Sequence, residues 1–269
     1  MELVEAAASP ELLAPFDEQT GFDVAAGRRR LFALRRTQAG TLVGSAVLGR
    51  GALDLHVEPE FRARGFGGAA AARLLELAGD EPLGAWSHED HPAAQALATR
   101  FGFARTRELL QLRLPRLDGF EARPATAAIG AFRPGADDAE WLALNARVFA
   151  WHPEQGAMTA EDLAQRMAEP WFRADDFLVA RDASGTMTGY NWLKIEPGAD
   201  EGEIYVIGVA PEEAGKGLGR TLMEAGLARL RERGCTAAEL FVEGDNERGI
   251  RLYRSLGFVD RARHVQYTR

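Results

Sequence analysis

The sequence contains little cysteine and no long apolar run. Cys235 is the only cysteine in 269 residues, so no disulfide can form within the chain and a reducing compartment is favoured. Residues Met1 to Glu5 lack the basic segment and apolar run of a secretion signal. Charges also interrupt each apolar run before the roughly 18 residues that a membrane helix needs. These absences predict a cytoplasmic protein that has no membrane partner.

Positive charge is also in short supply. Lys and Arg number 32 against 40 Asp and Glu, so the formal net charge is −8 and the isoelectric point is near 5.3. Nucleic-acid binding needs a basic surface that displaces counterions from phosphates, and this balance disfavours it. We therefore expect a small cationic or neutral ligand and no nucleic-acid partner.

The sequence repeats itself, and its length fits two medium domains. Residues 57–67 align without a gap with residues 209–219, sharing Val, Pro, Glu and two glycines. Further on, residues 97–103 and 252–258 each close a helix-like stretch with Gly-Phe. The repeat predicts two homologous domains, 1–120 and 130–269, joined near the Pro- and Gly-containing stretch 116–135.

Within each copy the pattern alternates strands and helices. In the second copy, residues 203–210 are apolar and β-branched as in a buried strand, and Pro211 ends it. Apolar positions from 218 to 233 give a helical stripe that stops at Gly234. A strand at 238–242 follows, and then a helix that Asp245 or Asn246 caps and Gly257 ends. This order predicts an α/β fold in which each domain has a mixed, partly parallel sheet flanked by helices.

The glycine turn before each first helix is suited to an anion. Closely spaced glycines let backbone N–H groups converge on a phosphate, and the helix dipole adds to the attraction. We expect residues 215–220 to hold a pyrophosphate, and the turn recurs at 62–68. A dinucleotide-binding fold fits less well because residues 211–214 separate the strand from the glycines. A phosphate-binding loop with Gly-Lys-Ser/Thr is absent.

These residues resemble the GNAT acetyltransferase superfamily, whose acetyl-CoA motif is Arg/Gln-x-x-Gly-x-Gly/Ala after a strand. Arg62, Gly65 and Gly67 match it fully, whereas the second copy has Ala214 at the Arg/Gln position. The resemblance implies two tandem GNAT-like domains that use acetyl-CoA as cosubstrate and no metal. It assigns these residues to acetyl-CoA binding: Leu55, His56, Val57, Ala63, Arg64, Gly65, Phe66, Gly67, Gly68, Ile207, Gly208, Val209, Ala214, Gly215, Lys216, Gly217, Leu218, Gly219, Arg220, Asn246, Glu247, Arg248, Gly249, Ile250 and Arg251.

A narrower resemblance covers most of the chain and is to the mycothiol synthases, a tandem-domain family within that superfamily. It rests on segments 152–156 (His-Pro-Glu-Gln-Gly), 169–172, 192–194, 202–209, 242–246 and 265–267. It implies a monomeric enzyme that acetylates the cysteinyl amine of Cys-GlcN-Ins. Asn191, Leu193 and Phe241 depart from the family's usual His, Thr and Tyr. The residues implied to contact this substrate are Glu18, Glu154, Lys194, Glu203 and Phe241.

Acetyl transfer to an amine needs a base, an oxyanion site and an acid. Glu203, at the start of the strand that leads to the turn, is suited to remove the ammonium proton, directly or through water. The N–H groups of residues 207–209 are suited to polarise the acetyl oxygen, and Tyr253 to protonate the sulfur. The alternatives, a solvated carboxylate for Glu203 and a core tyrosine for Tyr253, stay open. Gly51 and Ala98 occupy the equivalent positions of the first copy, which predicts a degenerate first domain and a catalytic second one.

Other interpretations have their own signals. Another tandem GNAT enzyme would acetylate a different small amine, and a non-catalytic acyl-CoA-binding module would need neither Glu203 nor Tyr253. Cys235 has no adjacent base and is not expected to be a nucleophile. His88-Glu89-Asp90-His91 is followed by Pro92, which favours a loop that caps a helix over a metal site.

Overall fold

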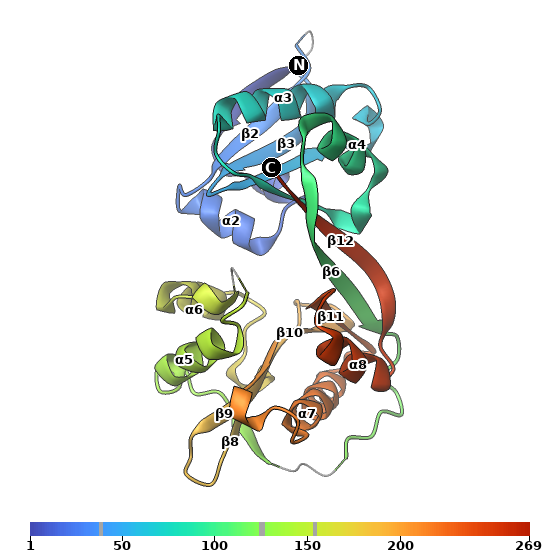
Figure 1. Cartoon of the computed structure of the whole chain (residues 1–269). Helices are drawn as coiled ribbons and strands as arrows, with labels where there is room; N and C mark the ends of the chain where they lie inside the picture. The colour runs from blue at the N-terminus through green and yellow to red at the C-terminus, as the bar shows by residue number, and fades with distance from the viewer. Residues whose placement is uncertain (38–39, 124–126, 153–154) are drawn as a thin grey trace. The chain divides into compact units, whose positions relative to one another are not determined.

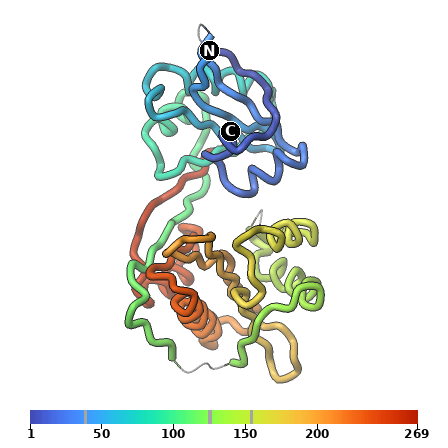
Figure 2. The backbone as a smooth tube through the Cα atoms, turned by 180° about the vertical axis from the view of Figure 1, so that it is seen from behind, coloured from blue at the N-terminus to red at the C-terminus, as the bar shows by residue number. Residues whose placement is uncertain are grey.

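The computed structural model describes residues 1–37, 40–123, 127–152 and 155–269 (Figure 1). Contacts between Cα atoms divide the chain into two units. Unit 1 comprises Met1–Leu109 and Ala262–Arg269, and unit 2 comprises Leu110–Arg261. The trace in Figure 2 passes from unit 1 into unit 2 and returns to unit 1 with the last strand.

Unit 1 is built on a sheet with the strand order β1-β2-β3-β4-β5-β12. β4 and β5 are parallel, and the β1–β2, β2–β3, β3–β4 and β5–β12 pairs are antiparallel. The elements are β1 (Glu2–Ala6), α1 (Pro10–Leu13), α2 (Glu18–Ala25), β2 (Arg30–Arg35), β3 (Leu42–Gly49), β4 (Ala52–Val57), the 3₁₀ helix η1 (Pro59–Phe61), α3 (Phe66–Ala78), β5 (Gly84–Ser87), η2 (His88–Asp90), α4 (Pro92–Phe101), β6 (Ala104–Leu114), which continues into unit 2, and β12 (Val259–Thr268), which begins there.

Unit 2 repeats the plan with the strand order β6-β11-β10-β9-β8-β7. β10 and β11 are parallel, whereas the β7–β8, β8–β9 and β9–β10 pairs are antiparallel. Its elements are β7 (Ala128–Ala131), α5 (Asp138–Val148), η3 (Gln155–Ala157), α6 (Ala160–Met167), η4 (Ala174–Asp176), β8 (Phe177–Arg181), β9 (Met187–Lys194), β10 (Glu201–Val209), η5 (Pro211–Glu213), α7 (Leu218–Glu232), β11 (Ala237–Glu243) and α8 (Glu247–Ser255).

The fold class expected from the repeat is confirmed in both units. Each has a strand, a 3₁₀ turn, a glycine-started helix, a parallel strand and a second helix in the same order. The expected strand 203–210 is β10, and the expected helix 218–233 is α7, which Gly234 follows with a φ of 89°. Asn246 rather than Asp245 caps α8, because its side chain accepts a hydrogen bond from the Gly249 N–H.

The units differ from the expected domains 1–120 and 130–269 at their ends. Residues 110–120 lie in unit 2 and residues 262–269 in unit 1. The end of the last strand lies in unit 1 because residues 265–268 pair antiparallel with β5 from Ser87 back to Gly84. Backbone hydrogen bonds in both directions between Leu83 and Arg269 close the pairing. The repeat is a local sequence pattern, so it could not predict that the C-terminal residues pair with a strand of the first domain.

Two apolar layers cover the two faces of the unit 2 sheet. One joins Leu193 and Ile204 of the sheet to Leu227 of α7 and to Tyr253 of α8. The other joins Trp192 and Val206 to Trp141 of α5 and Leu163 of α6. We call these the α7/α8 face and the α5/α6 face. Among the residues that the structure describes, no helix has the length and apolar character to cross a membrane.

Candidate active site

The glycine turn of unit 2 has the backbone that an anion site requires. Gly215 and Gly217 adopt φ values of 88° and 93°, which L side chains rarely reach. Gly217 is the N-cap of α7 and no side chain caps the helix there. A Cβ at Gly217 would meet open space. The first N–H groups of α7 therefore lie at an open turn, which fits a pyrophosphate.

Three cationic side chains lie near this turn, and they differ in their interaction partners. Lys216 extends from the turn with its Nζ 3.1 Å from Glu213. Arg220 instead donates to the hydroxyl of Ser255 and lies 3.6 Å from Glu224. The Nη2 of Arg248 lies 3.8 Å from the position of a Cβ at Gly215. Lys216 and Arg248 are thus the cations best placed to offset the Ala214 departure.

β10 and β11 are paired only along the first part of their length. Their parallel pairing runs from Glu201↔Ala237 to Ile204↔Leu240 and ends there. Residues 206–209 of β10 continue to pair with β9 on the other side. The edge of residues 207–209 that faces β11 is therefore available to an extended, amide-containing arm such as pantetheine. At Gly208 a Cβ would lie 2.5 Å from the Cζ of Tyr190, so the position requires glycine.

An irregularity in β10 reorients the strand at this point. The β9 register shifts between Ile204, which pairs with Leu193, and Val206, which pairs with Trp192. Tyr205 is the extra residue of a β-bulge. Tyr205 and Val206 both contact the apolar layer of the α5/α6 face.

Glu203 lies on the α5/α6 face next to Lys194, whose ammonium group contacts two aromatic rings. It is half-buried and pairs with Lys194 across β9 and β10. The Lys194 Nζ lies 5.1 Å from the ring centroid of Trp171 and 5.8 Å from that of Tyr205, within the range of cation–π attraction. Its Nζ also lies 3.1 Å from Glu196. A carboxylate and an ammonium thus share one sheet face.

Tyr253 of α8 lies on the α7/α8 face. Its side chain is buried among the apolar residues of that layer, and within the described part of the chain its hydroxyl has no protein hydrogen-bond partner. Burial raises the pKa of Tyr253 to about 12. The phenol is therefore a neutral proton donor at any physiological pH.

The other residues that the family resemblance assigns to the substrate lie on different elements and in different units. Phe241 of β11 is 40% exposed. Glu18 is the first residue of α2 in unit 1, whereas Lys194, Glu203 and Phe241 belong to unit 2. Glu154 lies outside the described residues.

Sequence reasoning missed a histidine–carboxylate pair in unit 2. The His152 Nε2 lies 3.5 Å from the Glu243 Oε1. The His152 Nδ1 accepts a hydrogen bond from the Gln155 N–H at 3.0 Å. The residues lie far apart in the chain, so only the fold brings them together. The His-Pro-Glu-Gln-Gly motif was the one available signal.

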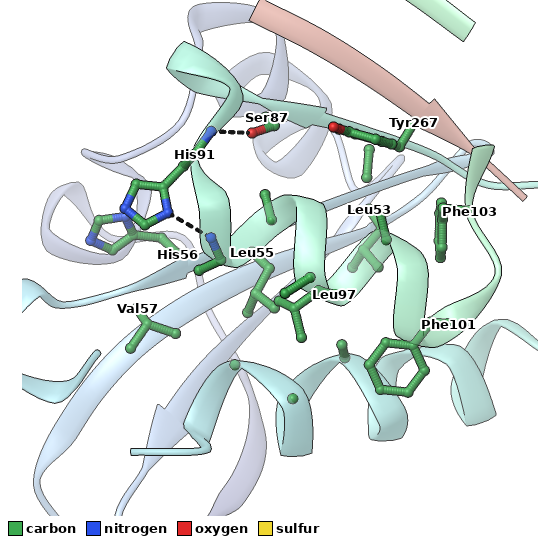
Figure 3. A pocket seen from close by; sticks show the side chains of 18 of the residues that line it. Leu53, Leu55, His56, Val57, Ser87, His91, Leu97, Phe101, Phe103 and Tyr267 are labelled. Atoms are coloured by element: carbon green, nitrogen blue, oxygen red, sulfur yellow. Dashed lines mark hydrogen bonds between the residues drawn. The ribbon is translucent and has the colours of Figure 1, made fainter. Parts of the chain in front are cut away.

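Unit 1 has a pocket of about 460 Å³ beside β4 and its glycine turn, the elements equivalent to β10 and the glycine turn of unit 2 (Figure 3). It is lined by Leu55, His56 and Val57 of β4 and by part of the turn at 62–68. Gly65 is the N-cap of α3 with a φ of 83°, as Gly217 is for α7. Of the acetyl-CoA residues expected in the first copy, all but Arg64 and Phe66 line this cavity.

The motif arginine of unit 1 is engaged by the backbone. The Arg62 Nε donates to the Val57 carbonyl at 3.0 Å, so it braces the end of β4. The Arg100 Nη1 lies 2.9 Å from the position of a Cβ at Gly68. Arg100 was not expected at this site and brings a cation to the turn from α4.

Tyr267 was also missed as a pocket residue of unit 1. It comes from β12 and lines the pocket (Figure 3), and its hydroxyl donates a hydrogen bond to Asp90 at 2.7 Å. Ala98 lines the same pocket at the position equivalent to Tyr253. Gly51, equivalent to Glu203, has a φ of 69° just before β4. Neither Glu203 nor Tyr253 of unit 2 therefore has a counterpart at its equivalent position.

The segment 88–91 and Cys235 have surroundings that oppose metal binding and thiolate chemistry. His91 caps α4, since its Nδ1 accepts from the Ala93 N–H, and Pro92 begins the helix, which confirms the loop interpretation. The described residues contain no group of three His, Cys, Asp or Glu side chains placed to hold a metal ion. Burial raises the pKa of the Cys235 thiol, which opposes thiolate formation.

Comparison with known proteins agrees with this geometry. Residues 3–103 and 141–258 match the model of the acetyltransferase (GNAT) family. The chain is 43% identical to a mycothiol acetyltransferase of Clavibacter michiganensis, over 100% of this chain and 90% of that protein. It is 44% identical to one of Salinispora tropica, over 98% and 90%.

Solved structures share the fold. A tandem GNAT protein from the clavulanic acid biosynthesis pathway has a TM-score of 0.75 and 21% identity, covering 100% of this chain and 98% of that one. A GCN5-related N-acetyltransferase from Sphaerobacter thermophilus has a TM-score of 0.73 and 19% identity, covering 99% and 95%. The chain therefore belongs to the acetyltransferase (GNAT) family and, by its identity over the whole length, to the mycothiol acetyltransferases within it.

Proposed function

We propose that this protein transfers the acetyl group of acetyl-CoA to the cysteinyl amine of Cys-GlcN-Ins and so forms mycothiol. The observation that carries the proposal is the opening between β10 and β11 beyond Ile204 and Leu240. The open turn before α7 lies at the end of β10, Glu203 lies on the α5/α6 face, and Tyr253 lies on the α7/α8 face. The full-length similarity to mycothiol acetyltransferases supports this acceptor.

In the proposed reaction, Glu203 takes one proton from the ammonium group of the acceptor. The neutral amine then forms a bond to the acetyl carbon, while N–H groups among Ile207, Gly208 and Val209 hold the carbonyl oxygen. The carbon–sulfur bond breaks, and Tyr253 gives its proton to the sulfur. The second proton that leaves the nitrogen restores the phenol, and the proton on Glu203 passes to water.

Binding of acetyl-CoA in unit 2 rests on three groups of residues. The N–H groups from Gly215 to Arg220 hold the pyrophosphate, with Ala214 contributing backbone only. Lys216 and Arg248 supply positive charge. The start of α8, residues 246–251, flanks the cofactor on the β11 side. Lys194, Phe241, Glu154 and Glu18 are assigned to the acceptor.

Unit 1 is proposed to bind a second acetyl-CoA without turning it over. Leu55, His56 and Val57 line the pocket wall, and residues 63–68 form the phosphate turn. The absence of a glutamate at Gly51 and of a tyrosine at Ala98 supports a degenerate role for the first domain. The protein is further proposed to act as a monomer in the cytoplasm.

The direct test is incubation of the purified protein with acetyl-CoA and Cys-GlcN-Ins, with the product identified by mass spectrometry. We expect one added acetyl group on the amine and one equivalent of free CoA. Turnover of another amine but not of Cys-GlcN-Ins would contradict the proposed acceptor. Binding of acetyl-CoA without turnover of any amine would identify a non-catalytic acyl-CoA-binding module.

A further inference from the structure

Unit 2 exposes two aromatic side chains. Among the described residues, the large apolar side chains with the greatest exposure include only two aromatics, Trp151 at 57% and Phe241 at 40%. Single exposed apolar side chains are ordinary on protein surfaces, but neighbouring aromatic ones indicate a binding surface.

The His152–Glu243 pair connects them. Trp151 packs against His152, with ring centroids 5.5 Å apart and planes at 64°. The His152 Nε2 lies 3.5 Å from the Glu243 Oε1. Phe241 is two residues before Glu243 in β11, so both side chains lie on the same face of the strand. Trp151 is thus linked through His152 to Glu243, whose side chain shares a strand face with Phe241. We call these four residues the aromatic–acid patch.

The polar centre of this patch is held from both ends. Because the His152 Nδ1 accepts the Gln155 N–H, its Nε2 carries the hydrogen and faces Glu243. The Glu243 carbonyl accepts the N–H of Asn246, the N-cap of α8. The side chains of His152 and Glu243 are only 15% and 10% exposed. The pair is therefore a fixed feature, whereas the Trp151 ring beside it faces solvent.

The patch lies on the acceptor side of the sheet. Leu240 and Val242 belong to the apolar layer under α7 and α8, so the alternate residues 239, 241 and 243 face the other way. Glu239 is in register with Glu203, which puts Glu203, Phe241 and Glu243 on the same face. Phe241 and Glu243 also lie past the last β10–β11 pair, where the strands have separated.

The chemistry of the patch fits a ring that carries many hydroxyl groups. Such a ring presents C–H groups on one side, which pack on an aromatic face, and hydroxyls at its rim, which donate to a carboxylate. We propose that the aromatic–acid patch binds a cyclic polyol of the acceptor. Trp151 stacks on its apolar side and Glu243 accepts a hydroxyl hydrogen. The inference rests on the proposed function, since it assigns part of the acceptor to these residues.

Trp151→Ala tests the stacking role, with Trp151→Tyr as the conservative variant and Val259→Ala as the matched control. Val259 is a 55% exposed apolar residue at the start of β12 and is outside the patch. We expect Trp151→Ala to raise the KM for Cys-GlcN-Ins about tenfold, equivalent to about 1.4 kcal/mol. The KM for acetyl-CoA and the melting temperature stay near wild type, Trp151→Tyr restores most of the loss, and Val259→Ala changes none of these values.

A binding measurement separates this inference from the enzyme activity. GlcN-Ins, which lacks the cysteine and cannot be acetylated at a cysteinyl amine, is titrated into the full-length protein by calorimetry. Its Kd should rise by the same factor in Trp151→Ala and should also rise in Glu243→Gln. Binding that persists without any turnover of Cys-GlcN-Ins would refute the proposed function but leave the subsite intact.

A shortened acceptor shows whether Trp151 stacks on the glucosamine ring or on the inositol ring. If Trp151→Ala raises the KM for Cys-GlcN, which lacks inositol, as much as that for Cys-GlcN-Ins, Trp151 stacks on the glucosamine. If the effect is confined to Cys-GlcN-Ins, it stacks on the inositol. Unchanged KM values for both acceptors together with an unchanged Kd for GlcN-Ins would overturn the inference.

Discussion

Glu203 of β10 and Lys194 of β9 are direct cross-strand partners. Side chains of such partners point to the same face of a sheet, so a carboxylate and an ammonium lie together on the α5/α6 face. The lysine is held by the rings of Trp171 and Tyr205. The carboxylate proposed as general base therefore has a positively charged cross-strand neighbour on the same sheet face.

Replacing Glu203 by Gln should lower kcat by about 10²- to 10⁴-fold, the usual contribution of a positioned base. The acidic limb of the pH dependence of kcat/KM should also flatten, because no carboxylate remains to ionise there. Steady-state rates measured from pH 5 to 9 give both values.

Glu239→Gln is the matched control for that variant. Glu239 is in register with Glu203 on β11, but its carboxylate accepts hydrogen bonds from Gln111 and Arg261, both at 2.8 Å. It should retain near wild-type kcat. Equal losses of kcat in Glu203→Gln and Glu239→Gln would show that acidic side chains on this face affect kcat only through the stability of the protein.

Gly217→Ala should weaken CoA binding. Gly217 has a φ of 93° and Gly234 a φ of 89°, and a Cβ at either meets open space. Alanine should therefore cost a similar ~1–2 kcal/mol of backbone strain at both positions. Only Gly217 lies at the turn before α7, so only Gly217→Ala should raise the Kd for CoA in calorimetry. A similar Kd for the two variants would place the pyrophosphate elsewhere.

Gly65→Ala makes the same change in unit 1. Gly65 is the N-cap of α3 with a φ of 83° and open space around a Cβ. If unit 1 binds acetyl-CoA without catalysis, the variant should lower the number of bound acetyl-CoA molecules from two to one and leave kcat unchanged. A loss of kcat as large as that of Gly217→Ala, at matched stability, would contradict the assignment of one catalytic and one degenerate domain.

Tyr205→Phe should weaken acceptor binding through Lys194. The Tyr205 hydroxyl accepts a hydrogen bond from the Arg166 Nε at 2.9 Å, and the ring lies beneath Lys194. Loss of this bond, worth ~1 kcal/mol, should loosen the ring and raise the KM for Cys-GlcN-Ins about three- to tenfold. The KM for acetyl-CoA should not change.

Tyr190→Phe is the control for a purely structural hydroxyl. Tyr190 is fully buried and donates to Asn145 at 2.8 Å. Its variant should lower the melting temperature and leave the acceptor KM unchanged. If Tyr205→Phe behaves in the same way, Tyr205 has no role in positioning Lys194.

Local sequence patterns predicted the repeat because the glycine turns and the strands before them are local. Gly65 and Gly217 adopt the left-handed backbone that glycine favours, so the closely spaced glycines were a local signal for the turn. The bulge at Tyr205 depends on the register with β9, which the residues of β10 do not encode. The placement of Tyr267 in the unit 1 pocket depends on pairing with β5 across more than half the chain. The contact of His152 with Glu243 is long-range in the same way.

Tyr253→Phe tests the acid. The phenol is buried, and burial raises its pKa to about 12, so it still carries its proton when the sulfur begins to leave. The variant should chiefly lower kcat, with little change in either KM, because the hydroxyl acts in the transition state rather than in ground-state binding. Ionisation of Tyr253 should produce an alkaline limb in the rate profile only near its pKa of about 12.

The raised pKa of Tyr253 also makes the free energy of unfolding depend on pH. Between pH 10 and about 12 the unfolded tyrosine loses its proton while the folded one keeps it, so the unfolded state binds fewer protons and stability falls as pH rises. Tyr253→Phe removes this contribution and should flatten the alkaline decline of the unfolding free energy, measured by urea titration. A variant that keeps wild-type kcat but loses the alkaline decline would show that Tyr253 is buried as described and that water or the acceptor's own thiol protonates the sulfur.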